Sequence, residues 1–203
     1  MDPFYDYDNA AMVAAACDEA SATEGAPAEL DPSRFAAFAT TPSEIDEETL
    51  GQLVAIIDGK TDATPKPPSS TLKPAPATID RLLNSDTVVY ITDNGLPVAV
   101  ATIIDPTQKS YLGFKPIEQY SLASGVNLDG MLQQEFFAVS DQYRNMDIGK
   151  ELRAQIAALG LHTFILSATD DTETAKGLLS NGYELAAVLP DDGTGNPANL
   201  WIG

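Results

Sequence analysis

The chain has 203 residues, and its 30 Asp and Glu against 11 Lys and Arg give a formal net charge of -19. This charge repels nucleic-acid backbones and anionic lipid, so we expect no nucleic acid and no membrane among the partners. No apolar run has the length of a bilayer span, and the acidic start is unlike a secretory signal, which favours a soluble protein, intracellular or virion-associated. One cysteine and one histidine exclude an intrachain disulfide and argue against a zinc site, so we predict no metal.

Residues 1–31 differ in composition from the rest of the chain. Aspartates and aromatics open this segment, and the Ala-rich stretch "NAAMVAAACDEA" carries only a thin apolar stripe at helical spacing. We interpret the segment as an acidic N-terminal arm, either a solvated tail or a stretch ordered by docking on a protein partner or a second copy. Residues 32–203 are then the folded domain.

The first half of that domain predicts a strand, two helices and a hairpin. "RFAAFAT" reads as a strand, and the apolar spacing from Leu50 to Ile57 indicates a helix with Ser43 near its start and Gly59 at its end. Residues 60–77 are proline-rich and predict an extended loop before a short helix, "TIDRLLNSD". In "TVVYITDNGLPVAVATIID", two β-rich runs flank a tight-turn sequence and predict a hairpin.

Residues 106–130 form a long connection with three aromatic residues. A connection of this length in a compact domain tends to be functional or partner-bound. We therefore expect it to cover an acceptor site or to contact a protein partner, with a connection that carries no site as the alternative.

The second half predicts alternating strands and helices. "LQQEFFAV" is a strand, and the next helix has an apolar face made by Ile148, Leu152, Ile156 and Leu159. "HTFILSA" is a strand, "DDTETAKGLLSNG" a helix capped by one of its first two residues, and "YELAAVLP" with "ANLWIG" a final strand pair. The order β-α-α-β-β-β-α-β-α-β-β predicts an α/β fold (an α+β mixed sheet), with a partly parallel sheet and helices on its faces.

Four stretches in that order resemble the GNAT N-acetyltransferase superfamily over residues 32–203. They are "TTPSEID", "VVYITDNGLPVAVATII", "FFAVSDQYRNMDIGKEL" and "AKGLLSNGYEL". The third is similar to the family's acyl-CoA motif, a strand followed by Arg/Gln-x-x-Gly-x-Gly/Ala. The hairpin and the last helix and strands also resemble degenerate GNAT-like proteins of tailed phages.

The resemblance implies a cofactor, acetyl-CoA, bound in an opening between the fourth and fifth strands. Its pantetheine is expected to pair with the backbone of Phe137, Ala138 and Val139. Its pyrophosphate is expected on the amides of a loop that ends in a helix N-terminus, where converging N–H groups and the helix dipole favour anions. The loop residues implied are Arg144, Asn145, Met146, Asp147, Ile148 and Gly149.

Two departures from the family pattern bear on activity. The family has glycine where this chain has Asp147, which either points outward and caps the helix or fills the site and repels the pyrophosphate. Such a repulsion costs about 1–4 kcal/mol at surface-like dielectric. Where active members often carry a tyrosine that protonates the departing thiolate, the matching residue is Leu178 or Leu179, while Tyr183 matches a core position.

The candidate general base is Glu135, since the resemblance implies a carboxylate on the fourth strand. Strand alternation predicts that it shares a sheet face with Phe137. The alternative is a solvated residue near the strand end. His162, the one histidine, is expected to be structural or exposed.

These residues support two hypotheses. In the first, an N-acyltransferase moves an acetyl group from acetyl-CoA to an amine or protein acceptor, and the acidic surface attracts a cationic amine or a lysine. In the second, a catalytically silent GNAT-fold protein, for example a phage virion component, is structural and docks on a protein partner or a second copy through residues 1–31 and 106–130.

Overall fold

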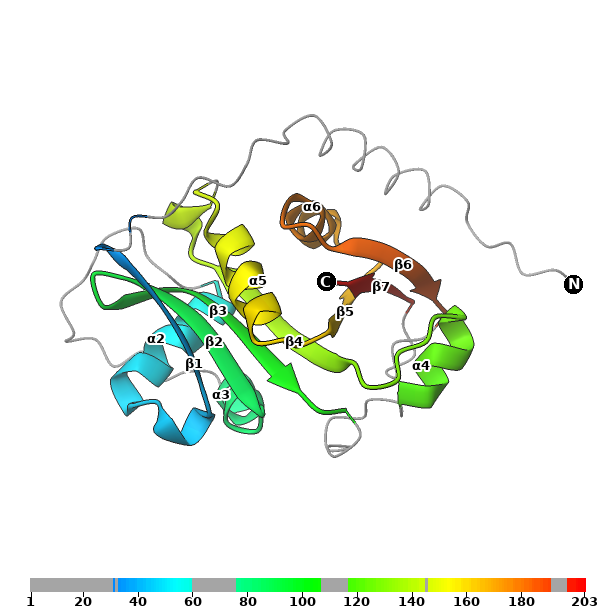
Figure 1. Ribbon diagram of the computed structural model, residues 1–203, viewed down its shortest axis with the longest axis horizontal. Helices are drawn as coiled ribbons and strands as arrows, with labels where there is room; N and C mark the ends of the chain where they lie inside the picture. Colours follow the sequence, from blue (N-terminus) through cyan, green and yellow to red (C-terminus); the bar gives the residue numbers. More distant parts are fainter. Residues whose placement is uncertain (1–30, 32, 60–75, 107–116, 145, 191–196) are drawn as a thin grey trace, which may run out of the picture. The chain divides into compact units, whose positions relative to one another are not determined.

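The computed structural model of the chain describes residues 31, 33–59, 76–106, 117–144, 146–190 and 197–203 (Figure 1). The chain divides into two compact units built from interleaved segments. Of the described residues, unit 1 comprises 117–130, 164–190 and 197–203, and unit 2 comprises 31, 33–59, 76–106, 131–144 and 146–163. The predicted arm lies, except for Asp31, outside the described residues, as does most of the proline-rich loop.

Unit 2 contains an antiparallel sheet in which strands adjacent in sequence are also neighbours in space. Its strands are β1 (Phe35–Thr40), β2 (Thr87–Asp93), β3 (Leu96–Ile104) and β4 (Leu132–Val139). Asn94 and Gly95, with φ of 49° and 85°, make the two-residue turn between β2 and β3. The predicted hairpin is confirmed, because these residue types tolerate positive φ at a tight turn.

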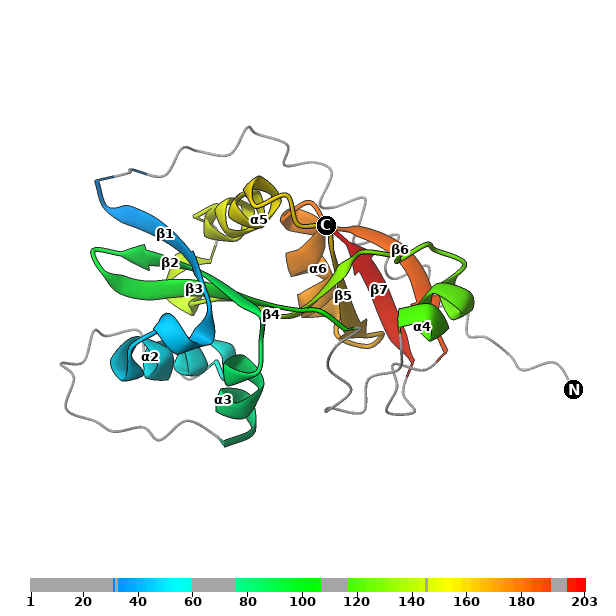
Figure 2. The same ribbon diagram turned by 60° about the horizontal axis from the view of Figure 1, so that its bottom comes forward.

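Helices cover both faces of this sheet (Figures 1 and 2). The helix α5 (Ile148–Ala158) packs on one face, while α2 (Glu47–Ile57) and α3 (Pro76–Leu83) pack on the other. The α5 face buries Val89, Ile91, Val98, Ala99, Ala101, Ile103, Ile148, Leu152 and Ile156. The opposite face buries Leu50, Leu53, Val54, Ile56, Leu82, Val88 and Val100.

The helix ends of unit 2 correct three details of the sequence prediction. Asp46, not Ser43, caps α2, because its carboxylate accepts a hydrogen bond from the Thr49 N–H at 2.8 Å. The α3 helix begins at Pro76, inside the stretch predicted as a loop. Leu159 is 45% exposed, because α5 ends before it and turns it out of the apolar face. Gly59 has a φ of 65° and ends α2 as predicted.

The first residues of β5 (Thr163–Ala168) lie beside the first residues of β4. The Leu132 N–H donates to the His162 carbonyl at 2.9 Å, and the Thr163 hydroxyl lies 3.5 Å from the Gln134 amide oxygen. The seven strands of the described residues belong to one mixed sheet, as the two α crossovers predicted.

Unit 1 contains the remaining strands, with the last strand between the two that precede it. In β5-β7-β6 order, β7 (Ala198–Ile202) pairs antiparallel with both β5 and β6 (Glu184–Leu189). The α6 helix (Thr172–Ser180) is capped by Asp171, whose carboxylate accepts from the Thr174 N–H at 2.9 Å.

The long connection is not wholly extended. Its second part forms the helix α4 (Ile117–Ser124), which the sequence pattern did not predict. Tyr120 on this helix is buried in unit 1, with its ring 6.4 Å from that of Phe164. The apolar pattern of α4 is weak, so the helix depends on packing, to which buried Tyr120 contributes. Residues 107–116 lie outside the described residues.

The fold class predicted from the sequence is confirmed: helices and seven strands form a mixed α/β architecture, with α4 added to the predicted order. None of the described helices has both the length and the apolar character needed to cross a membrane.

Two leucines test this packing: Leu152 in the middle of α5 and Leu159 directly after its last residue. Leu152 is fully buried, so Leu152→Ala should lower the free energy of unfolding by about 2–5 kcal/mol through lost burial and a cavity. Leu159→Ala should lower it by less than about 1 kcal/mol. Urea denaturation of both variants measures the difference, and equal losses would contradict the described helix orientation.

Candidate functional site

The loop between β4 and α5 (residues 140–147) is a compact turn that begins on the sheet. Ser140 donates its N–H to the Val98 carbonyl at 2.8 Å, which fixes the loop's first residue against β3. A single turn of 3-10 helix, Asp141–Tyr143, follows, and the Met146 N–H then donates to the Tyr143 carbonyl at 3.3 Å. This folding brings the start of α5 to the end of β4.

The first turn of α5 supplies backbone donors. In α5 the Glu151 N–H bonds to the Asp147 carbonyl at 3.0 Å, so the N–H groups of Ile148, Gly149 and Lys150 lie at the helix N-terminus. Helix N-terminal N–H groups and the positive end of the helix dipole suit an anion such as a phosphate. The role of this loop toward a cofactor stays a prediction.

Asp147 adopts a left-handed backbone conformation, with φ of 56° and ψ of 10°. Asp147 occupies the N-cap position of α5, but its side chain makes no capping hydrogen bond to the helix, which disfavours the alternative in which its carboxylate caps α5. The carboxylate instead lies 3.1 Å from the Lys150 ammonium. Because an L residue is strained by about 1–2 kcal/mol in this conformation, the backbone itself favours glycine at this position.

The charges of the loop are internally paired. Arg144 lies 2.8 Å from Asp141, with both side chains more than half exposed, and Lys150 is held by Asp147. An incoming anion would therefore compete with two carboxylates for the two cations. At the exposed Arg144–Asp141 pair the competition involves about 0–1 kcal/mol.

A buried carboxylate, Asp93, lies at the same end of the sheet as the loop. Its side chain is 6% exposed and accepts four hydrogen bonds: from Arg34 Nε at 2.7 Å and Nη2 at 2.6 Å, from the Tyr143 hydroxyl at 2.6 Å, and from Asn94 Nδ2 at 2.8 Å. The Arg34 guanidinium is the main cause of the lowered pKa of Asp93. Burial, followed by the contact with Asp93, raises the pKa of Tyr143, which keeps its hydroxyl protonated as a donor.

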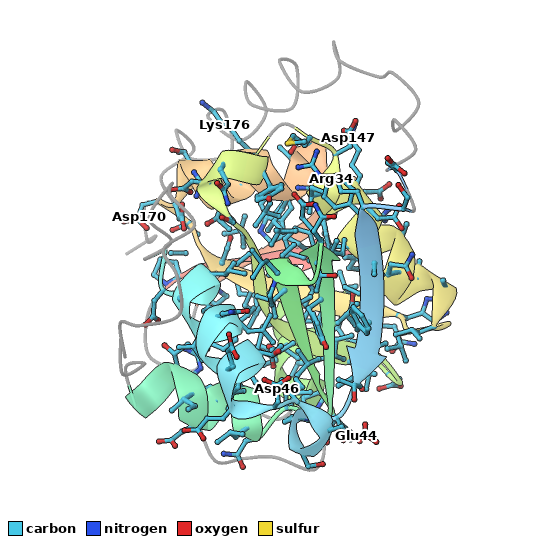
Figure 3. All side chains as sticks on the ribbon, turned by 90° about the vertical axis from the view of Figure 1, so that its left-hand side faces the viewer. Arg34, Glu44, Asp46, Asp147, Asp170 and Lys176 are labelled. Atoms are coloured by element: carbon cyan, nitrogen blue, oxygen red, sulfur yellow. The ribbon has the colours of Figure 1, made fainter. Side chains whose placement is uncertain are left out.

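Strand register explains why these groups meet. Phe35 pairs with Asp93 and Ala99 pairs with Val139, so the start of β1, the end of β2 and the end of β4 lie at one end of the sheet. Figure 3 shows Arg34 and Asp147 at this end of unit 2, with Glu44 and Asp46 at the opposite end.

Glu135 is buried rather than solvated, with a side chain that is 1% exposed. Arg81 on α3 donates from Nε to its carboxylate at 2.5 Å and also lies over the Phe136 ring, 4.4 Å from its centre. Adjacent strand residues normally point to opposite faces, but here the ladder with β3 shifts register between Thr102 and Ile103. The bulge turns Glu135 toward α3, so the predicted shared face with Phe137 is wrong.

Solved structures show which fold these elements form. The chain is similar to an acetyltransferase of the GNAT family from Bacillus cereus, with a TM-score of 0.53, 10% identity, and coverage of 83% of this chain and 96% of that one. It is also similar to a putative acetyltransferase of the GNAT family from Desulfovibrio desulfuricans. That comparison has a TM-score of 0.53 and 12% identity, and it covers 83% of this chain and 98% of that one. The chain has the GNAT fold. The AHL synthase LasI is also similar, with a TM-score of 0.52, 12% identity, and coverage of 83% and 89%, so this fold alone does not fix a reaction.

The other comparisons give no match: no protein-family model and no curated protein is similar to the chain by sequence. At 10–12% identity, the GNAT fold of this chain is visible in its backbone arrangement rather than in its residues.

Within this GNAT fold, the residues expected to meet pantetheine lie on the last part of β4. Phe137, Ala138 and Val139 pair with Ala101, Val100 and Ala99 of β3. Their role toward a cofactor stays a prediction, and so does that of Asn145, which lies outside the described residues.

Unit 1 contains the two positions, Leu178 and Leu179, at which the family resemblance implies a tyrosine. Leu178 is 3% exposed and Leu179 is half-buried, so the apolar α6 face continues through both candidate positions. Tyr183 is 2% exposed, which confirms its prediction as a core residue. His162 is exposed, as expected, and its carbonyl accepts from Leu132. Among the described side chains, no group of three or more His, Cys, Asp or Glu is placed to hold a metal ion.

Sequence reasoning missed the residues that support the site: Arg34, Asp93, Tyr143 and Arg81. In the sequence, Asp93 stands out only as part of the predicted hairpin stretch, and Tyr143 only as part of the stretch that resembles the acyl-CoA motif. One sequence signal could have found this cluster: Asp93 is an acidic residue at the end of a predicted buried strand, and a buried carboxylate requires a partner.

The Asp93 cluster predicts a specific pH dependence of stability. Because the folded state lowers the pKa of Asp93 from 3.8, its contribution is present well above that value and is lost as the pH falls through the folded-state pKa. Asp93→Asn should lower the free energy of unfolding by about 1–3 kcal/mol at neutral pH, and the gap to wild type should shrink in acid.

Urea titrations from pH 7 to pH 2 measure this gap, with Asp80→Asn, which changes an exposed carboxylate on α3, as the control. A gap that stays constant over the whole range would contradict the ionised role of Asp93.

Proposed function

We propose that this protein is an N-acyltransferase that moves an acetyl group from acetyl-CoA to an amine. One observation carries the proposal: in a chain with the GNAT fold, the loop after β4 leads directly into the N-terminus of α5, where a helix presents its first backbone N–H groups. These donors suit the cofactor pyrophosphate. The residues proposed for cofactor binding are Phe137, Ala138, Val139, Arg144, Asn145, Met146, Asp147, Ile148 and Gly149.

In the proposed reaction, the neutral amine attacks the thioester carbonyl, and the C–S bond breaks as the tetrahedral intermediate collapses. Glu135 accepts the proton that the amine loses, directly or through a water molecule. The departing thiolate takes its proton from solvent, because Leu178 and Leu179 have no proton to give.

Arg81 supports this role of Glu135. Its guanidinium donates to the buried carboxylate and balances its charge.

The proposed acceptor is a cationic amine, either a small molecule or a lysine of a protein. The net charge of -19 raises the local concentration of cations near the surface. The structural or virion role stays a prediction, because residues 1–31 and 107–116 fall almost entirely outside the described chain. The phage resemblance likewise stays a prediction.

Calorimetric titration with acetyl-CoA tests the proposed cofactor. We expect wild-type binding at micromolar concentrations, about tenfold tighter in Asp147→Asn because the charge is lost, and tighter again in Asp147→Gly because glycine also removes the side chain and lets the backbone approach the phosphates. Asp80→Asn is the charge-matched control and should bind like wild type. Absence of binding by wild type and both Asp147 variants would refute the proposal and leave the assembly hypothesis in front.

A second experiment tests the base. Glu135→Gln keeps an acceptor for Arg81 but cannot take a proton, so kcat should fall by about 10²–10⁴ while acetyl-CoA affinity stays within twofold. Release of the CoA thiol is measured with a panel of polyamines and lysine-containing peptides. Full activity in the variant would assign the proton transfer to another group.

A further inference from the structure

The loop between β4 and α5 makes three contacts that fix it to the sheet. At its start, Ser140 bonds to the β3 backbone, and at its end Ile148 is buried among residues of β2 and β3. In its middle, the Tyr143 hydroxyl donates to the buried carboxylate of Asp93 at 2.6 Å. The Tyr143 contact is thus the one of these three that joins the middle of the loop to the sheet.

The ion pairs of the loop cannot replace that contact. Arg144 with Asp141 and Lys150 with Asp147 each join residues three apart in sequence. A pair within the loop, or between the loop and its own helix, does not fix the loop relative to the sheet. The Arg144–Asp141 pair is also exposed enough to be weak and sensitive to salt.

Tyr143 joins the loop to two further elements. Its ring meets Phe35 of β1 edge-on, with centroids 6.4 Å apart and planes at 87°, and it packs against the apolar cluster under α5. Asp93 is itself held by two nitrogens of Arg34. The acceptor of the Tyr143 hydroxyl is thus fixed before the loop meets any ligand, which is the condition for a preorganised site.

Tyr143 also determines the path of the loop backbone. Its N–H donates to the Ser140 carbonyl at 2.8 Å, and its carbonyl accepts from the Met146 N–H. A shift of Tyr143 would therefore move both halves of the turn and change the direction in which the first N–H groups of α5 point.

We propose that Tyr143 is a positioning residue: through its hydrogen bond to Asp93, it holds the loop Ser140–Gly149 in the conformation that presents the α5 amides to an anion. The identity of this anion as the pyrophosphate of acetyl-CoA rests on the proposed function. Tyr143 does not touch the reacting atoms. The Arg34–Asp93–Tyr143 chain acts only on the shape of the loop.

Tyr143→Phe tests the proposal, because it keeps the ring against Phe35 and removes only the hydroxyl. Tyr90→Phe is the matched control, since Tyr90 is a half-buried tyrosine of β2 that stacks on Phe38, 5.0 Å away. Two quantities are measured for each variant: amide hydrogen exchange in the peptide covering residues 140–152, and calorimetric affinity for acetyl-CoA.

A hydrogen bond to a charged acceptor corresponds to about one decade in an equilibrium constant. In Tyr143→Phe we expect about tenfold faster exchange at Arg144 and Met146, and about tenfold weaker acetyl-CoA binding. In steady state, KM for acetyl-CoA should rise more than kcat falls. Tyr90→Phe should change neither the loop exchange nor the affinity.

The outcomes separate this proposal from the proposed function. Unchanged loop exchange in Tyr143→Phe overturns the positioning role, whether or not acetyl-CoA binds to wild type. Faster exchange with weaker binding supports both proposals. Faster exchange in a protein that does not bind acetyl-CoA at all supports the positioning of the loop and refutes only the cofactor.

Discussion

The burial of one carboxylate, Asp93, is the constraint on which the site end of unit 2 depends. A buried ionised group is costly unless its oxygens are satisfied, and here donors from three separate elements converge on them. The need to satisfy this charge ties together the start of β1, the hairpin turn and the loop after β4. The loop that is the candidate anion site thereby becomes part of the sheet's own framework.

The candidate loop combines features that favour an anion with features that oppose one. Helix N-terminal N–H groups and two basic side chains favour it, while Asp141 and Asp147 compete for those same cations. The paired charges make the loop nearly neutral in a protein of net charge -19. Anion binding at this site must therefore rest on directed backbone donors more than on net charge.

Glu135 shows how a local irregularity determines the environment of a candidate base. Strand alternation alone gives the wrong face, because the bulge opposite Thr102 and Ile103 breaks the period of two. The result is a buried carboxylate that faces Arg81 instead of one at a solvated strand end. Bulges occur often beside functional sites for this reason: they turn a side chain without ending the strand.

The sequence by itself determined the periodic and local features: the strands, the hairpin turn at Asn94 and Gly95, and a helix following a loop of anion-binding type. These follow from side-chain spacing and from residues that tolerate particular φ values, which are local properties. Only the tertiary structure decided the α4 helix, the direction of Glu135 and the convergence of Arg34 and Tyr143 on Asp93. Each depends on strand register and on packing between segments far apart in the chain, and no local pattern encodes which buried charge will meet which donor.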